Sequence, residues 1–165
     1  MKYIIILILF FFIPFSHIYS SQAIFGIANV IDGDTIKINA KKIRLEGIDA
    51  PEAKQKCTKK TLSILKKKIE KKYFCGTRST QELKKLIEKK LVKCSISGKD
   101  KYKRYLGTCY QEKININKIM VRKGYAVAYK RYSKRYINDE NYAKENKLGL
   151  WEGTFLRPEK WRKLK

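Results

Sequence analysis

The chain has 165 residues and carries 39 Lys and Arg against 15 Asp and Glu, which gives a formal net charge of +24. This length suits one domain with a hydrophobic core, and this charge predicts an anionic partner such as a nucleic acid. The single histidine, His17, lies near the N-terminus, so the rest of the chain offers no imidazole for a general base, a zinc site or a Ser-His-Asp triad. Hydrolytic chemistry would therefore depend on carboxylates, Tyr, Lys, Arg or a metal held by oxygen atoms.

Residues 1–23 have the pattern of a secretory signal peptide. Their apolar run, residues 4–15, is shorter than the roughly 20 residues that a membrane-spanning helix needs, and small residues precede a cleavage point before Ile24. We expect an exported protein, secreted or periplasmic, with a folded domain over residues 24–153 and a basic tail over residues 154–165. The alternative is an uncleaved membrane tether formed by residues 4–15.

Acidic residues gather in one segment of this basic chain. Five of the 15 acids fall between positions 32 and 52, where an even scatter would place about two. These five are Asp32, Asp34, Glu46, Asp49 and Glu52. Such a cluster indicates a bound cation.

The same segment has the pattern of short strands joined by turns. Gly33 is expected to take a positive φ in a tight turn, and the alternation in TIKI and KIRLEGI places Arg44 on the strand face opposite the core. If the strands pair, Asp34 at the turn and Asp49 at a strand end converge. Two carboxylates, a main-chain carbonyl and waters suit Ca²⁺ or Mg²⁺. The alternative is a hairpin with solvated turn acids.

Four cysteines in a chain expected to be exported predict disulfides, and three pairings are possible. Cys94 and Cys109 flank a charged loop at similar distances, as cross-strand partners would, which favours Cys94–Cys109 and leaves Cys57–Cys75. Without export, free thiols are the alternative. The absence of a C-x-x-C pair and of histidine makes a zinc site a poor interpretation.

Lysines dominate residues 54–72, with nine lysines and one acid. The segment has some helical periodicity, and much of it reads as a solvated loop tied at its base by Cys57–Cys75. It is either an ordinary charged face or a surface that holds the backbone of a polyanion.

The second half of the chain predicts three helices between short strands. Ser79 and Glu82 form a capping-box pattern for a helix over about 80–90. Asn115 is expected to cap the next helix, which Gly124 ends, and a last helix covers about 138–147. Tyrosines interleaved with basic residues follow the second helix, a pattern that suits base stacking beside phosphate contacts, or tyrosines that pack at the edge of the core.

Five stretches in this order resemble the staphylococcal nuclease (thermonuclease) family, in its exported bacterial form. They are VIDGDTIKI, IRLEGIDAPE, DKYKRYLGTCY, the unit over 117–129 and KLGLW. The resemblance covers about residues 26–152. It implies an α+β, mainly β, OB-fold with a five-stranded barrel and about three packed helices. It also implies Ca²⁺-dependent cleavage of DNA and RNA, with single strands preferred, by a monomer without a stable protein partner.

The resemblance implies roles for individual residues. The Ca²⁺ ligands would be the carboxylates of Asp34 and Asp49 and the main-chain carbonyl of Ala50. The catalytic residues would be Glu52 as general base and Arg44 and Arg104 on the scissile phosphate. The substrate-binding residues would be Lys101, Tyr102, Tyr129 and Tyr132, although the register of the tyrosines, with Tyr125 as another candidate, is open.

Two features depart from the family pattern. Lys103 stands where the family usually has Gly. If that turn needs a positive φ, lysine strains the chain there and Arg104 would point away from the phosphate. The excursion over 54–75 is longer than usual.

The alternative function is a non-catalytic OB-type module that binds nucleic acid or another polyanion.

Overall fold

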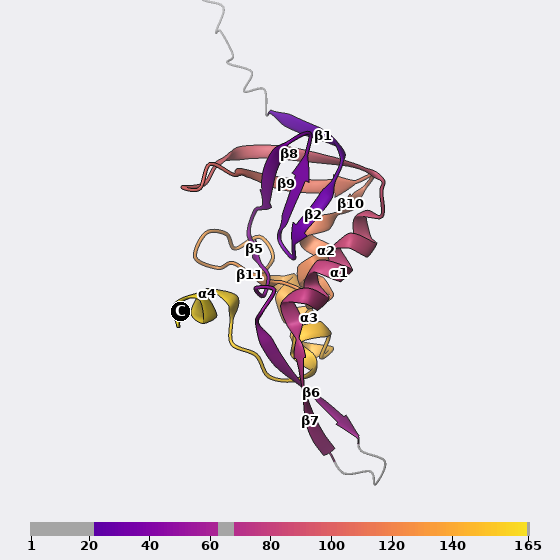
Figure 1. The fold of residues 1–165 in the computed structure, drawn as a ribbon, viewed down its shortest axis with the longest axis vertical. Helices are drawn as coiled ribbons and strands as arrows, with labels where there is room; N and C mark the ends of the chain where they lie inside the picture. The colour runs from indigo at the N-terminus through magenta and orange to yellow at the C-terminus, as the bar shows by residue number, and fades with distance from the viewer. Residues whose placement is uncertain (1–21, 63–67, 165) are drawn as a thin grey trace, which may run out of the picture.

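The computed structural model describes residues 22–62 and 68–164, and its main element is one strongly curled sheet (Figure 1). The strands of this sheet follow the order β1-β8-β9-β4-β3-β2, with β10 paired to β9. Their bounds are β1 Ala23–Ile27, β2 Asn29–Asp32, β3 Thr35–Ile38, β4 Lys41–Leu45, β8 Leu91–Lys99, β9 Tyr105–Gln111 and β10 Ile114–Asn115.

The first strand closes this sheet into a barrel. Only Ala28 separates β1 from β2, yet β1 pairs with β8 at one edge and β2 pairs with β3 at the other. Counted as one bent strand, β1 and β2 join β3, β4, β8 and β9 as the five strands that were expected, and β10 is a two-residue addition. The mixed α+β class is therefore confirmed, and the sheet has the curvature of an OB-like fold.

Helices pack below the barrel and complete the core (Figure 1). They are α1 Cys75–Ile87, α2 Ile116–Arg122, α3 Ile137–Glu145, the 3₁₀ helix η1 Gly149–Glu152 and α4 Pro158–Arg162. The core alternates as the sequence predicts, since Ile36, Ile38, Ile43 and Leu45 are fully buried. Two further pairs of strands lie outside the main sheet: β5 Ile48–Asp49 with β11 Val127–Ala128, and β6 Lys56–Leu62 with β7 Lys68–Phe74.

The turn between β2 and β3 is confirmed, but the reason for its glycine is different from the one predicted. Gly33 is not among the residues with positive φ. Instead, a Cβ at this position would lie 2.7 Å from the Cβ atoms of Ala50 and Ser79. The absence of a side chain thus lets the turn approach the segment after β5 and helix α1 closely, which brings the acids of the turn towards Asp49.

Helix α1 begins earlier than the capping-box pattern predicts, so that interpretation was wrong. The helix starts at Cys75, directly after β7, and Ser79 lies inside it. The Ser79 hydroxyl donates to the carbonyl of Tyr125 at 2.5 Å instead of capping a helix end. The main-chain N–H of Cys75 donates to the carbonyl of Gln55, which fixes the start of the helix against the chain that leaves the acidic segment. By contrast, Asn115 caps α2 as predicted, because its side chain accepts from the N–H of Lys118.

The lysine-rich segment is neither helical nor a plain loop. It forms the antiparallel ribbon β6–β7, which projects away from the barrel (Figure 1), and residues 63–67 lie outside the described residues. Tyr73 pairs with Cys57 and Lys71 pairs with Lys59 in its ladder. A run of lysines gives no apolar alternation, so periodicity carried no strand pattern here.

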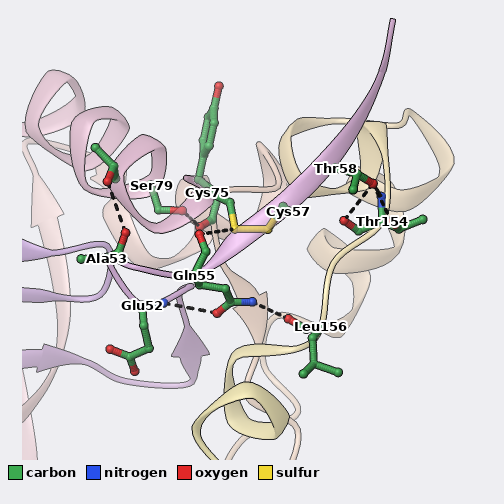
Figure 2. The surroundings of a disulfide bond; sticks show 11 residues. Glu52, Ala53, Gln55, Cys57, Thr58, Cys75, Ser79, Thr154 and Leu156 are labelled. Carbon is green, nitrogen blue, oxygen red and sulfur yellow. Dashed lines mark hydrogen bonds between the residues drawn. A yellow bond between two sulfur atoms is a disulfide. The ribbon is translucent and has the colours of Figure 1, made fainter. Parts of the chain in front are cut away.

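Both predicted disulfides, Cys57–Cys75 and Cys94–Cys109, are present. Cys94 and Cys109 face each other across β8 and β9, as the cross-strand interpretation requires. Cys57–Cys75 joins the base of the ribbon to the start of α1, where Gln55 also contacts the C-terminal segment (Figure 2). Disulfides are typical of proteins outside the cytoplasm, which supports an extracytoplasmic location.

Replacing Cys57 and Cys75 together with alanine is expected to lower the free energy of unfolding by about 2–4 kcal/mol, because the open chain regains loop entropy. Denaturant unfolding of the oxidised protein and of the double variant measures this difference. The Cys94–Cys109 double variant is the comparison, since its sequence separation of 15 is close to the 18 of Cys57–Cys75. Equal midpoints for wild type and the Cys57/Cys75 variant would contradict the expectation.

The ends of the domain differ in what the structure describes. Residues 1–21, most of the predicted signal peptide and all of the alternative tether, lie outside the described residues, and the predicted cleavage point before Ile24 falls within β1. No helix among residues 22–62 and 68–164 has the length and apolarity to cross a bilayer. The segment expected as a basic tail is folded over 154–164: it includes α4 and packs on the domain.

Candidate active site

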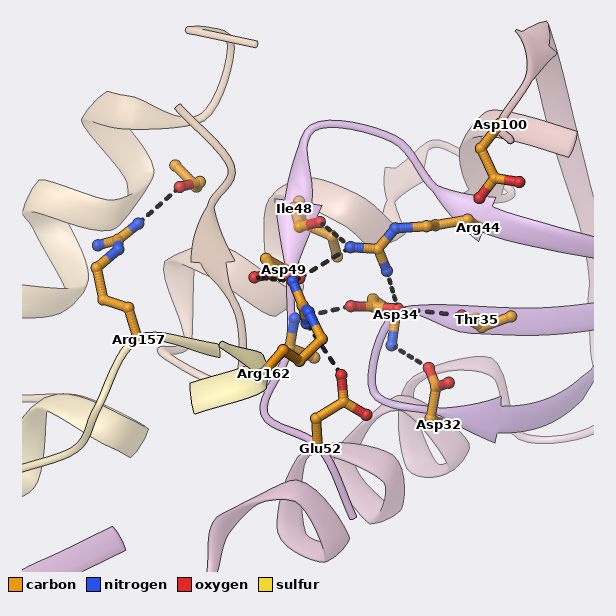
Figure 3. A network of polar contacts seen from close by, with 12 residues as sticks. Asp32, Asp34, Thr35, Arg44, Ile48, Asp49, Glu52, Asp100, Arg157 and Arg162 are labelled. Carbon is orange, nitrogen blue, oxygen red and sulfur yellow. Dashed lines mark hydrogen bonds and ion pairs between the residues drawn. The ribbon is translucent and has the colours of Figure 1, made fainter. Parts of the chain in front are cut away.

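The predicted acids meet at one edge of the barrel. Asp34 lies in the β2–β3 turn and Asp49 ends β5, and their side chains converge on the guanidinium of Arg44 from β4 (Figure 3). Arg44 forms an ion pair with Asp34 Oδ1 and lies 2.9 Å from Asp49 Oδ1. It also donates to the carbonyl of Ile48 at 3.3 Å. Alternation along β4 explains this placement, since the residues on either side of Arg44 point into the core.

Local hydrogen bonds hold Asp34 in this orientation. The N–H of Ala50 donates to Asp34 Oδ2 at 2.8 Å, and the Thr35 hydroxyl donates to Asp34 Oδ1 at 3.0 Å. The turn residue Asp32 accepts from the N–H of Asp34. Ala50, whose carbonyl is the predicted ligand, lies next to Asp34 and orients it with its N–H group.

Glu52 lies just beyond the buried acids, on the loop that Pro51 stiffens. Its N–H faces the side chain of Gln55 at 3.4 Å, and its carboxylate binds Arg162 at 2.9 Å. Asp49 is fully buried, whereas the side chain of Glu52 is 41% exposed. The site thus combines buried carboxylates with a carboxylate that water can reach.

Burial and neighbouring charges shift the pKa values of the acids in different directions. Burial raises the pKa of Asp49, the Asp34 charge raises it further, and Arg162 and Arg44 offset this only in part, so that it reaches about 6. Burial also raises the pKa of Asp32 to about 6, with Asp34 contributing. For Asp34, burial is outweighed by Arg44 and the Ala50 N–H, and its pKa lies below the ordinary value.

These carboxylates fit a hard divalent cation. Asp34 and Asp49 already hold one positive group, Arg44, between them, which shows that the two side chains converge on a position that a cation can occupy. Among the described residues, no group of three or more His, Cys, Asp or Glu side chains could hold a metal ion. The two carboxylates would therefore act with main-chain carbonyls and water, as Ca²⁺ and Mg²⁺ sites commonly do.

Cation binding at this site is expected to weaken as the pH falls from 7.5 to 5. A protonated Asp49 is neutral and cannot act as a ligand, so with a pKa near 6 the affinity for Ca²⁺ should fall by about tenfold at pH 5, and binding should release a proton. Calorimetric titration with Ca²⁺ at several pH values measures this. An affinity that stays constant from pH 7.5 to pH 5 would contradict this expectation.

Arg104 directly precedes β9, the strand next to that of Arg44, but its side chain is paired elsewhere. Strand β9 runs parallel to β4, with Leu106 opposite Arg44, so Arg104 leads into the strand next to that of Arg44. Its Nε and guanidinium contact Asp100 at 2.8 and 2.7 Å, within the loop between β8 and β9. The described contacts of Arg104 therefore do not join it to Asp34, Asp49 or Glu52.

The loop before Arg104 needs a positive φ at Lys103, the position where the family usually has Gly. Lys103 has φ 62°, in the left-handed region that favours glycine. The loop is stabilised by Asp100, which accepts from the N–H groups of Tyr102 and Arg104 at 2.9 and 3.0 Å. Lysine is therefore accommodated at a cost of roughly 1–2 kcal/mol.

Replacing Lys103 with glycine should relieve this strain and stabilise the protein by about 0.5–1 kcal/mol, since part of the gain is offset by the greater freedom of glycine in the unfolded chain. Thermal unfolding measures the difference. Lys101→Gly is the matched control: Lys101 lies in the same loop, is exposed and does not have a positive φ, so its replacement should destabilise slightly. The explanation fails if both variants shift the midpoint equally.

The structure separates the candidate tyrosines. Tyr129 lies at the site, with Arg44 6.0 Å above its ring and Tyr132 in edge-on contact at 4.7 Å. Tyr125 lies instead beside Arg78 on the α1 side. Tyr102 is 68% exposed, and Lys101 covers its ring at 5.0 Å in the Arg104 loop. Of the candidate tyrosines, Tyr129 and its neighbour Tyr132 thus lie on the carboxylate side of the molecule.

Arg162 is the site residue that the sequence analysis missed. It lies at the end of α4, in the segment interpreted as a basic tail, and binds both Asp49 and Glu52. The one local indication was Pro158, since proline is favoured in the first turn of a helix and occupies the start of α4. That pattern predicts a helix but does not predict what the helix contacts.

The fold and the site together define a small α+β barrel with a carboxylate–arginine cluster at one edge of the sheet. A family model described as staphylococcal nuclease homologue matches residues 42–153. The chain therefore belongs to the staphylococcal nuclease family. The matched range includes Arg44, Asp49, Glu52 and Arg104 and ends before Arg162.

Curated relatives agree with this assignment. The chain is 31% identical over 135 residues to the succinoglycan biosynthesis protein ExoI of Rhizobium meliloti. This match covers 80% of the chain and 66% of that protein, just under two thirds of its length. The chain is 32% identical over 145 residues to an uncharacterized endonuclease of Haemophilus influenzae, with 83% and 71% covered. It is 30% identical over 155 residues to a micrococcal nuclease of Shigella flexneri, with 83% and 79% covered.

Proposed function

We propose that this protein is an exported, Ca²⁺-dependent endonuclease that hydrolyses phosphodiester bonds of DNA and RNA with little sequence specificity. The observation that carries the proposal is the convergence of Asp34 and Asp49 on Arg44, with Glu52 joined to Asp49 through Arg162. Family membership supports the reaction class, and the net charge of +24 supports a polyanionic substrate. We further propose that the enzyme acts as a monomer and prefers single strands.

The proposed roles follow the chemistry of each group. Asp34, Asp49 and the carbonyl of Ala50 would hold the ion. Bound there, Ca²⁺ would neutralise charge on the phosphate and act as a Lewis acid. Arg44 can leave its carboxylate partners for phosphate oxygens, which match its planar fork of donors.

Glu52 is proposed as the general base. Its carboxylate accepts a proton from water as the water oxygen attacks phosphorus. The new P–O bond forms as the bond to the leaving oxygen breaks, and that oxygen takes up a proton from solvent. Charge that develops on the phosphoryl oxygens in the transition state would be stabilised by Arg44 and by Arg104 after it exchanges Asp100 for phosphate.

The aromatic residues are proposed to hold the flanking nucleotides. Tyr129 and Tyr132 would stack on one side of the scissile bond, and Lys101 and Tyr102 would contact the strand from the Arg104 loop. Tyr132 and Tyr102 are 70% and 68% exposed, which leaves their rings available for stacking.

Digestion of single-stranded DNA and of RNA by the protein purified from its exported form tests the proposal. We expect cleavage of both substrates with millimolar Ca²⁺ and none with EGTA. Salt-sensitive binding without turnover in Ca²⁺ would overturn the proposal and favour a non-catalytic module that binds nucleic acid. Cleavage that persists in EGTA would overturn the role of the metal.

A further inference from the structure

The C-terminal segment, residues 154–164, reaches the site and places a guanidinium on two of its acids. One terminal nitrogen of Arg162 lies 3.0 Å from both carboxylate oxygens of Asp49, and the other lies 2.9 Å from Glu52 Oε1. Figure 3 shows Arg162 between Asp49 and Glu52. Asp49 is thus shared by two arginines from distant parts of the chain.

Polar contacts upstream of Arg162 hold the segment in this position. Arg157 binds the fully buried Glu140 of α3 at 2.6 Å and donates to the carbonyl of Ala128 at 2.8 Å. Burial alone would raise the pKa of Glu140, but Arg157 and two nearby lysines bring it below the ordinary value, so this acid stays ionised. Leaving Arg157 or Glu140 without its partner would be costly, so the segment is firmly docked.

A second anchor ties the segment to the chain that leaves the site. The side chain of Gln55 is fully buried and donates to the carbonyl of Leu156 at 2.6 Å (Figure 2). The hydroxyl groups of Thr58 and Thr154 lie 2.6 Å apart. Because Gln55 also contacts the N–H of Glu52, the position of the proposed base and that of the segment depend on the same residue.

The charges of the cluster give Arg162 a second effect. Asp34, Asp49 and Glu52 carry the negative charge, and Arg44 and Arg162 carry the positive charge that balances most of it. A divalent cation that binds Asp49 meets the charge of Arg162 and competes with the contact that Arg162 makes to both oxygens of this carboxylate. Arg162 therefore opposes cation binding while it fixes the two carboxylates.

We propose that Arg162 is a positioning residue of the nuclease site. It holds Glu52 through Oε1, which leaves Oε2 for the attacking water, and it lowers the affinity of the carboxylates for Ca²⁺. The proposal rests on the proposed function for its effect on turnover, but not for its effect on Ca²⁺ binding. A planar fork suits this role because one guanidinium can bridge two carboxylates in a fixed geometry.

Three variants test the proposal: Arg162→Gln, Arg162→Lys and Lys160→Gln. Lys160 lies on the same helix, is exposed, and shows no ion pair with the residues that the structure describes, so its replacement removes the same charge without touching the site. For each variant we would measure the dissociation constant for Ca²⁺ by calorimetry, kcat and KM on single-stranded DNA, and the melting temperature.

Arg162→Gln is expected to lower kcat by at least about tenfold, because Glu52 is no longer held. The same variant should bind Ca²⁺ at least about threefold more tightly, because a competing positive charge is gone. Arg162→Lys should bind Ca²⁺ nearly as wild type does but should not recover kcat, since an ammonium cannot bridge both acids. Lys160→Gln should match wild type in both quantities.

A loss of kcat together with tighter Ca²⁺ binding separates positioning from a purely structural role. If Arg162→Gln lowered kcat, Ca²⁺ affinity and melting temperature together, or changed none of them, the proposal would be overturned. If wild type failed to cut any nucleic acid, the proposed function would fail, and the Ca²⁺ titration would then decide alone: tighter binding by Arg162→Gln would support the competition, and unchanged binding would refute it.

Discussion

Glu52→Gln is expected to reduce kcat on single-stranded DNA by about 10²- to 10⁴-fold, because glutamine keeps the shape of the side chain but cannot accept a proton from water. The fold should be unaffected, since Glu52 is partly exposed, its main-chain N–H keeps the contact with Gln55, and the amide oxygen of glutamine can still accept from Arg162. Single-turnover cleavage with saturating Ca²⁺ measures the chemical step without interference from product release.

The matched control is Glu46→Gln. Glu46 belongs to the same acidic segment, is partly exposed, and uses its main-chain carbonyl to accept from Asn117. This variant removes the same charge from the same part of the chain, so it should retain nearly full activity. Equal rates for wild type and Glu52→Gln would remove Glu52 from the mechanism and direct the search for a base to the remaining acids.

Asp49→Asn is expected to lower the affinity for Ca²⁺ by at least about 100-fold, since even residues behind metal ligands commonly contribute 10- to 100-fold. Because Asp49 is buried, a water molecule cannot easily take the place of its carboxylate as a ligand. The substitution should change the free energy of unfolding less than it changes the free energy of Ca²⁺ binding. The reason is that the burial that raises the pKa of Asp49 to about 6 already penalises its charged form in the folded protein.

The pH dependence provides an independent check of this variant. In wild type, Ca²⁺ binding should weaken below about pH 6 as Asp49 takes up a proton, and in Asp49→Asn that loss should be absent. Asp32→Asn serves as the comparison, because burial and Asp34 also raise the pKa of Asp32 to about 6, yet it contacts the main chain of the turn. If Asp32→Asn removed the pH dependence and Asp49→Asn did not, the ligand assignment would be reversed.

The acidic half of the site could be predicted because its geometry is local. Asp34, Arg44 and Asp49 lie on consecutive turns and strands, and an alternation of period two fixes which side chains share a face. Their convergence on one another follows once β3 pairs with β4. The same alternation gave the buried positions of the barrel strands, and the preference of Asn for the N-cap position gave the cap of α2.

The elements that were missed depend on contacts between distant residues. Ser79 has the sequence pattern of a helix cap, but the buried carbonyl of Tyr125 takes its hydroxyl instead. Arg162 reaches Asp49 only because Arg157 finds Glu140 and Leu156 finds Gln55, and nothing in a short basic segment indicates those partners. Local propensity is a weak guide wherever tertiary hydrogen bonds are available.

The way in which the edges of the strands are paired has a consequence for self-association. The two margins of the main sheet are formed by the halves of the bent first strand, with β1 paired to β8 and β2 paired to β3. These halves are short, with five and four residues, so each leaves only a short open edge that another chain could extend. The strands of the ribbon β6–β7 are longer, with seven residues each, and among the described residues no third strand pairs with either outer edge, although the N–H of Thr58 donates to the carbonyl of Thr154. The density of lysines in the ribbon places like charges along those edges, and charged edges repel a second copy. The composition that makes this segment hard to interpret as strands also protects those strands from aggregation.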